Sequence, residues 1–129
     1  MAADTIAVLS LKGGTGKTTT VRTLADVFRQ IGLDVLCVDL DPQGNLSDYF
    51  DVPPDAAPTI ADVLTGDAKV KEAAHEGIVP ATPILAEVER SLSGKMGREL
   101  VLKKALKDAR RQHDVILIDC PPEIGRAHV

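Results

Sequence analysis

The chain has 129 residues, which suits one small domain and excludes two; 44 % of them are hydrophobic and only 2 % aromatic, so we expect an aliphatic core. The formal net charge is −4, and no basic tail or block appears, so this stretch is a poor candidate for carrying a nucleic-acid surface itself. No apolar run approaches the ~20 residues of a membrane span, and the N-terminus lacks a signal-peptide pattern, so we expect a soluble, cytoplasmic protein without a membrane segment.

Three short apolar runs predict the strands of an α/β sheet. They span residues 6–9, 35–38 and 115–118, and each is continuous rather than alternating, which is typical of parallel strands buried on both faces. A weaker fourth candidate covers residues 77–81, where a proline disfavours an interior strand.

The residues between the first two runs predict a helix. Its apolar side chains fall on one face at helical spacing: Val21, Leu24, Ala25, Phe28 and Ile31. Gly32 stands where a helix end favours a residue that can take positive φ. Strand, helix and strand form a βαβ unit, whose crossover we expect to be right-handed.

A glycine-rich segment between the first run and this helix predicts a phosphate-binding loop. Glycines let successive backbone N–H groups point at a phosphate, and the N-terminus of the following helix adds its dipole. Lys17 supplies a positive charge for the β- and γ-phosphates, the Thr18 hydroxyl suits Mg²⁺, and Thr19 can reach the α-phosphate. The alternative is a glycine-rich turn with incidental lysines. The expected nucleotide-binding residues are Lys12, Gly13, Gly14, Thr15, Gly16, Lys17, Thr18 and Thr19.

Acidic residues follow the second and third runs. Ligands of open α/β sheets bind beyond the carboxyl ends of the strands, where Asp39, Asp41 and Asp119 stand. We expect Asp119, which closes an aliphatic strand before two prolines, to hold Mg²⁺ through water. The residues expected at the metal site are Thr18, Asp119 and Asp39. We expect Asp39 to order the loop and the water shell of the metal. The alternatives are an Asx-type turn at Asp39 and Asp41 and a strand-ending Asp before a proline turn at Asp119.

The middle of the chain predicts shorter helices. Thr59 can cap a helix that ends at Gly66, and further helices are expected over residues 83–92 and 98–112. The basic residues of the last one are interrupted by acidic ones, so we expect a solvated helix face there: Lys103, Lys104, Lys107, Arg110 and Arg111.

Two cysteines, Cys37 and Cys120, lie in or beside apolar runs and form no CxxC pair. We expect both to be buried thiols in a reducing cytosol rather than metal or redox residues.

The segment KGGTGKT at residues 12–18 resembles the deviant Walker A motif KGGxGK[ST] of the ParA/MinD family, because Leu11 stands where the ordinary P-loop pattern has glycine. The resemblance implies a P-loop NTPase with a mostly parallel sheet flanked by helices, truncated after the Walker B strand. It implies that Lys12 contacts the phosphates of the nucleotide in a partner subunit, and that Asp41 positions or activates the attacking water. Lys12, Lys17 and Asp41 are thus the expected catalytic residues.

The segment DPQGN at residues 41–45 is more similar to ParA/Soj partition ATPases than to MinD or the nitrogenase iron protein. This implies Mg·ATP binding, an ATP-dependent homodimer and slow hydrolysis in chromosome or plasmid partitioning. It also implies a ParB-like partner, nonspecific DNA binding through a missing C-terminal half, and association with the nucleoid at full length. The alternatives are an inert fragment and a ParA-like positioning ATPase for a non-DNA cargo.

The end of the chain departs from the family pattern, since ParA-type proteins continue into a second half. We expect residues 1–122 to be the N-terminal part of the ATPase domain and residues 123–129 to be a non-native tail. The last six residues, IGRAHV, are what a common sequencing-library adapter encodes. The alternative is a genuine C-terminus that matches by chance.

Overall fold

The structure, a computed structural model, describes residues 4–9, 15–92 and 94–120, with side chains described for 20–92 and 97–120. In chain order the elements are β1 (Asp4–Leu9), α1 (Thr15–Gln30), β2 (Val35–Asp39), α2 (Asn45–Tyr49), α3 (Ile60–Thr65), α4 (Val70–Ala73), β3 (Ile78–Val79), α5 (Leu85–Ser91), α6 (Gly94–Ala105), α7 (Ala109–Gln112) and β4 (Val115–Cys120). The phosphate-loop residues 12–14 and the tail 123–129 lie outside the described residues.

The described strands form one parallel sheet in the order β1-β4-β2-β3. The last strand is therefore central: Leu117 pairs with Ile6 on one side and with Cys37 on the other. All three predicted strands are confirmed, and the weak fourth candidate is a strand of two residues that pairs in parallel with β2. This arrangement confirms the expected α/β class.

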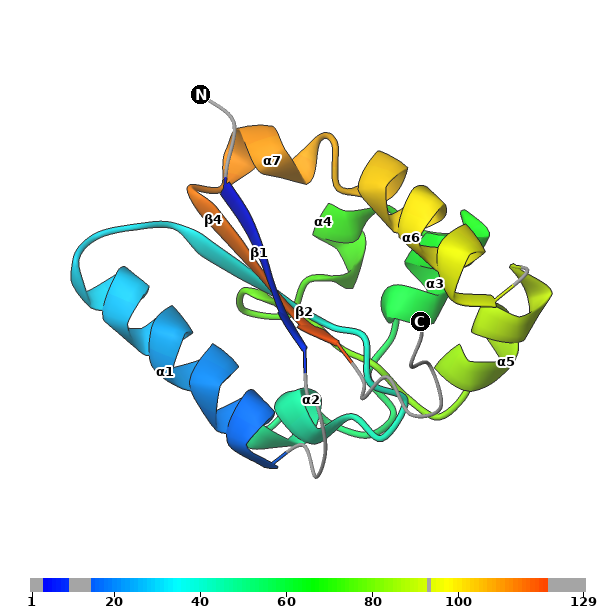
Figure 1. The fold of residues 1–129 in the computed structure, drawn as a ribbon, viewed down its shortest axis with the longest axis horizontal. Coiled ribbons are helices and arrows are strands. Elements are labelled where there is room, and N and C mark those ends of the chain that lie inside the picture. Colours follow the sequence, from blue (N-terminus) through cyan, green and yellow to red (C-terminus); the bar gives the residue numbers. More distant parts are fainter. Residues whose placement is uncertain (1–3, 10–14, 93, 121–129) are drawn as a thin grey trace, which may run out of the picture.

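Helices cover both faces of the sheet, as Figure 1 shows: α1 lies on one face and α3 to α7 lie on the other. Alternate residues of β2 face the two layers. Val35 and Cys37 belong to the core under α1, whereas Leu36 and Val38 belong to the core under the opposite helices. Burial on both faces is why the predicted strands are continuously apolar.

The first helix has the buried face that its sequence predicts, except at its end. Val21 and Ala25 are fully buried. Gly32 has a φ of 91°, its N–H donates to the Arg29 carbonyl, and the Leu33 N–H donates to the Phe28 carbonyl, which is a Schellman end. Ile31 was expected on the apolar face, but it lies beyond the last helical residue and is 68 % exposed.

The shorter helices confirm some predictions and correct others. Thr59 caps α3, where its N–H donates to the Asp62 carboxylate at 2.8 Å, and the helix ends at Gly66 with a φ of 86°. The single helix predicted over 98–112 is wrong, because α6 and α7 are separate. Between them the Lys107 N–H donates to the Lys104 carbonyl, an i to i−3 bond that tightens the turn. No helix of the described ranges is long and apolar enough to cross a membrane.

Candidate functional site

The carboxyl edge of the sheet gathers the acidic residues singled out in the sequence. Asp119 near the end of β4 pairs in register with Val8 of β1 and with Asp39 of β2. Asp41 follows two residues after the end of β2. Because parallel strands end at the same edge, carboxylates from two segments 80 residues apart meet there.

The first helix begins at this same edge. β1 ends at Leu9 and α1 starts at Thr15, so the glycine-rich segment connects a strand end to a helix N-terminus, the context that a phosphate loop requires. Figure 1 shows the start of α1 beside α2 at this end of the sheet, and the Arg22 guanidinium lies 4.4 Å from the centre of the Tyr49 ring. The start of α1 and α2 therefore both lie at the carboxyl edge of the sheet.

The structure describes only part of the expected phosphate loop. The residues 12–14 lie outside it, and 15–19 are described only as helical backbone at the start of α1. The side chains expected to hold the nucleotide therefore remain predictions.

Asp39 is completely buried, and hydrogen bonds engage both of its carboxylate oxygens. Oδ1 accepts the N–H of Asp41 at 3.0 Å. Oδ2 accepts the N–H of Ser47 at 3.0 Å and the Ser47 hydroxyl at 2.7 Å. Burial raises the pKa of the carboxyl from 3.8 to about 6, although the bonds from Ser47 and Asp41 lower it. Three donors on one carboxylate favour its role in ordering the loop over direct contact with a metal.

Asp41 stands at the start of a tight turn and is only 7 % exposed. Its Oδ1 accepts the N–H of Gln43 at 3.0 Å, and its carbonyl accepts the N–H of Gly44 at 2.8 Å. The Asx-type turn weighed as an alternative is thus present. Because the turn and the bond to Asp39 hold its backbone, Asp41 has a defined position at the edge of the sheet.

Asp119 is also fully buried, and its carbonyl accepts the N–H of Leu40 at 2.9 Å. A carboxylate suits Mg²⁺, which proteins commonly bind through one or two carboxylates together with phosphate oxygens. Within the described ranges, no group of three His, Cys, Asp or Glu residues could hold a metal ion. A Mg²⁺ ion held by Asp119, directly or through water, would therefore need the phosphate oxygens of a nucleotide beside it.

Ser47, which no sequence pattern singles out, completes this network. Its side chain is 6 % exposed. Its hydroxyl donates to Asp39 and accepts the N–H of Ala81 at 3.0 Å. A cavity of about 230 Å³ adjoins it, bounded by α2 and by the loop before α5. No local sequence pattern signals this role, because the bond to Ala81 spans 34 positions.

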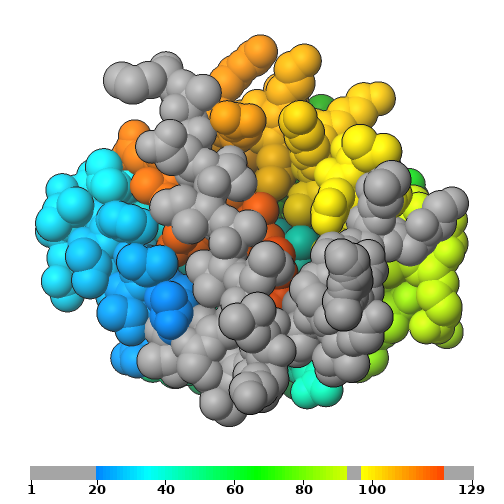
Figure 2. Space-filling model, viewed as in Figure 1, coloured from blue at the N-terminus to red at the C-terminus, as the bar shows by residue number. Residues whose placement is uncertain are grey.

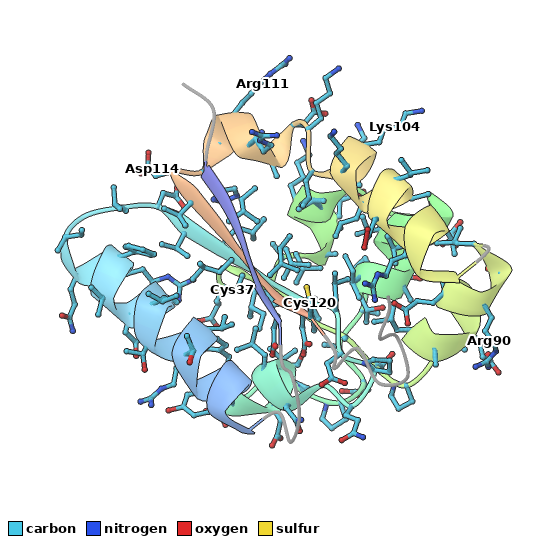
Figure 3. All side chains as sticks on the ribbon, viewed as in Figure 1. Cys37, Arg90, Lys104, Arg111, Asp114 and Cys120 are labelled. Carbon is cyan, nitrogen blue, oxygen red and sulfur yellow. The ribbon has the colours of Figure 1, made fainter. Side chains whose placement is uncertain are left out.

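A larger cavity of about 460 Å³ lies far from this edge, between the α3–α4 and α6–α7 segments. Lys104 of α6 and Arg111 of α7 line it, and both side chains point outward (Figure 3). In Figure 2, side chains of α6 and α7, in yellow and orange, project from the same part of the surface. Four members of the predicted basic face are exposed, and Arg110 is partly buried.

Both cysteines are buried, as predicted. They lie within the sheet in Figure 3, Cys37 in the core under α1 and Cys120 in the core of the opposite face. Burial raises the pKa of the Cys37 thiol from 9.0 to about 11, with Arg29 lowering it in part. A neutral buried thiol is a packing residue, not a nucleophile.

Known proteins share the sequence of this chain in part. A family model described as an AAA domain matches residues 3–129. The chain is 39 % identical to the sporulation initiation inhibitor protein Soj of Bacillus subtilis over 127 residues, or 93 % of this chain and 50 % of that protein. It is 37 % identical to the chromosome partitioning protein ParA of Myxococcus xanthus, with 93 % of this chain and 45 % of that protein covered.

A solved structure is also similar to this chain, in both fold and sequence. Cobyrinic acid a,c-diamide synthase from Mycobacterium smegmatis, with bound ATP analog and magnesium, matches with a TM-score of 0.84 and 40 % identity, over 95 % of this chain and 53 % of that one. The chain thus spans about half the length of the curated relatives that it matches. These similarities confirm the resemblance to ParA/Soj-type proteins. Because the family model matches nearly the whole chain, the chain belongs to the AAA-domain family.

Proposed function

We propose that this chain is the Mg·ATP-binding half of a ParA-type partition or positioning ATPase. The observation that carries the proposal is the carboxyl edge of the sheet, where Asp39, Asp41 and Asp119 gather beside the start of α1. Ligands of such sheets bind at this edge. The half-length similarity to Soj and ParA supports a role in partitioning or positioning.

The glycine-rich segment and α1 would hold the phosphates. Backbone N–H groups and the helix N-terminus favour a phosphate there, and Lys17 adds a positive charge. Thr18 and Asp119 would hold Mg²⁺, which neutralises charge on the transferring phosphoryl group when bound. Asp39 keeps the 41–45 loop in place beside them.

Two residues would carry the hydrolysis step. Asp41 orients the attacking water, and its turn and its bond to Asp39 fix where its backbone lies. Lys12 reaches the phosphates bound by a second copy, where a further cation stabilises the developing charge. Hydrolysis then requires an ATP-dependent dimer.

The similarity to Soj and ParA supports a cellular task in partitioning. Partitioning of a chromosome or plasmid would use a ParB-like partner and nonspecific DNA, bound through a C-terminal half of the parent protein at the nucleoid. The net charge of −4 supports placing that DNA surface outside this half. A positioning ATPase for a non-DNA cargo is the second candidate, and DNA binding by the parent protein separates the two.

The first test compares single substitutions in the full-length parent, whose sequence is read from genomic DNA beyond the codon for Pro122. Lys17→Ala should abolish ATP binding, because the loop loses its phosphate cation. Asp41→Ala should leave binding intact and slow hydrolysis by about 10²- to 10⁴-fold, the range for a positioned acid–base group. Asp55→Ala, which removes an exposed loop carboxylate, is the control. Wild-type hydrolysis in Asp41→Ala would remove Asp41 from catalysis.

A second substitution tests the position of Lys12. Lys12→Ala should impair hydrolysis and dimerisation more than ATP affinity. An equally large loss of ATP binding in the Lys12→Ala and Lys17→Ala monomers would contradict the cross-subunit role.

The same proposal holds that the 129 residues alone are not an active ATPase and that residues 123–129 are not native. β1 and β3 are the outer strands of the described sheet, and unpaired edges invite aggregation. We expect weak Mg·ATP binding without turnover in the purified chain. A soluble, cooperatively melting product with ATP-dependent dimerisation would contradict this expectation, and the genomic sequence after Pro122 decides the origin of the tail.

A further inference from the structure

We propose that Ser47 is a positioning residue that couples Asp41 to the segment around Ala81 through Asp39. The inference rests on the proposed role of Asp41 in hydrolysis. It adds a residue outside the expected nucleotide-binding set and a segment that lies 40 positions after Asp41.

The Ser47 hydroxyl is the centre of a directional pair of hydrogen bonds. Its single proton goes to Asp39 Oδ2 at 2.7 Å, so its oxygen is left as the acceptor for the N–H of Ala81 at 3.0 Å. The Ser47 N–H also donates to Asp39 Oδ2 at 3.0 Å. One buried side chain therefore fixes a carboxylate oxygen and a backbone N–H from another part of the chain.

The other oxygen of Asp39 transmits this constraint to Asp41. Asp39 Oδ1 accepts the Asp41 N–H at 3.0 Å, so the orientation of the Asp39 carboxylate sets where the turn begins. Asp39 is fully buried, which leaves water little access to replace a lost donor. A rotation of this carboxylate therefore displaces Asp41.

The segment around Ala81 also touches the far end of the same turn. A Cβ on Gly44 would lie 2.9 Å from the Ala81 carbonyl oxygen, so the two backbones are in close contact. The neighbouring Pro80 carbonyl accepts the N–H of Ile60 at 2.8 Å, which ties the segment to α3. A shift of α3 or of this segment thus reaches Asp41 through the Ser47 hydroxyl.

The main test uses substitutions that differ in the hydroxyl. Ser47→Thr keeps it, and the adjoining cavity of about 230 Å³ gives the added methyl room. Ser47→Val has nearly the same shape as Ser47→Thr without the hydroxyl. In the parent protein we expect Ser47→Val and Ser47→Ala to lower kcat by about 10- to 100-fold, since a misplacement of ~1 Å costs about 10²-fold. ATP affinity should stay within about twofold, and Ser47→Thr should retain wild-type kcat.

Amide hydrogen exchange in the same proteins provides a readout independent of activity. Exchange at Asp41 and Ala81 should be faster in Ser47→Val than in Ser47→Thr. Ser91→Ala is the matched control, because it removes an exposed hydroxyl that donates to the Val88 carbonyl within α5, and it should change neither kcat nor exchange at these sites.

The outcomes separate this inference from the proposed function. Wild-type kcat in a folded Ser47→Ala or Ser47→Val, with Asp41→Ala inactive, overturns the coupling and leaves the function standing. Equal loss of ATP affinity and kcat also overturns it, because that pattern indicates general damage to the site. Wild-type hydrolysis in Asp41→Ala overturns the proposed function itself, whatever Ser47 does.

Discussion

The middle and the end of β2 are equally buried but differ in chemistry. Leu36, Cys37 and Val38 are fully buried, and so is Asp39 at the end of the same strand. The first three are apolar and pack against helices on the two faces, whereas Asp39 is held by three hydrogen bonds. The raised pKa of Asp39 means that burial opposes its charge. The middle of the strand therefore stabilises the fold. The buried carboxylate at its end lowers the stability but holds the 41–47 segment in place.

The largest effect is expected where the apolar middle is broken. Leu36→Ala should lower the free energy of unfolding by about 2–5 kcal/mol, because it opens a cavity in a fully packed core. Leu100→Ala is the control, since Leu100 is 67 % exposed and its truncation should cost under about 0.5 kcal/mol. Urea denaturation of the two variants of the full-length parent measures both values, and similar losses would contradict the contrast.

A second prediction concerns the ionisable group in the apolar middle, Cys37. Its pKa is about 11 in the folded protein and 9.0 in the reference state, so between these values the unfolded chain is the first to lose its proton. The free energy of unfolding should therefore fall as the pH rises from 9 towards 11. Two pKa units correspond to about 3 kcal/mol.

The Cys37→Ala variant isolates that contribution from other groups that titrate at alkaline pH. The difference in unfolding free energy between wild type and Cys37→Ala should shrink by about 2 kcal/mol between pH 8 and pH 11, because the folded thiol is only half ionised at the upper limit. A difference that stays constant across this range would show that the thiol ionises without regard to burial.

The same contrast explains what the sequence could predict. The strands, α1 and the capped helix α3 follow from local patterns, because burial on both faces or on one helical face leaves a repeating mark in neighbouring residues. The acidic residues at the carboxyl edge of the sheet were also predictable, since they follow the apolar runs that predict the strands. Asp39, Asp41 and Asp119 are therefore recognisable from the sequence alone.

Two kinds of feature were not predictable: very short helices and contacts between residues that lie far apart in the sequence. α2 has only five residues after a glycine and α4 has four, too few for a helical period to appear. Ser47 gains its role from Asp39, eight positions away, and from Ala81, 34 positions away. Such hydrogen-bonded pairs depend on how the segments pack, so no local sequence pattern predicts them.

The smallest expected effect compares two glycines, one at the acidic edge and one away from it. Gly44 and Gly66 have φ values of 67° and 86°, so an alanine at either position meets the left-handed strain of roughly 1–2 kcal/mol. At Gly66 a Cβ would have no neighbour within 4 Å, but at Gly44 it would lie 2.9 Å from the backbone oxygen of Ala81. Gly44→Ala should therefore cost about 1 kcal/mol more than Gly66→Ala.

The two glycine variants should also differ in where the structure loosens. A backbone oxygen cannot move aside as a flexible side chain can, so Gly44→Ala must displace either the 41–45 turn or the segment that carries Ala81. Amide exchange should then rise at Asp41 and Ala81 in Gly44→Ala, whereas in Gly66→Ala it should rise only around the end of α3. Equal stability losses with no local change at Asp41 would mean that the turn and the Ala81 segment tolerate separation, and that their close contact does not constrain the acidic edge.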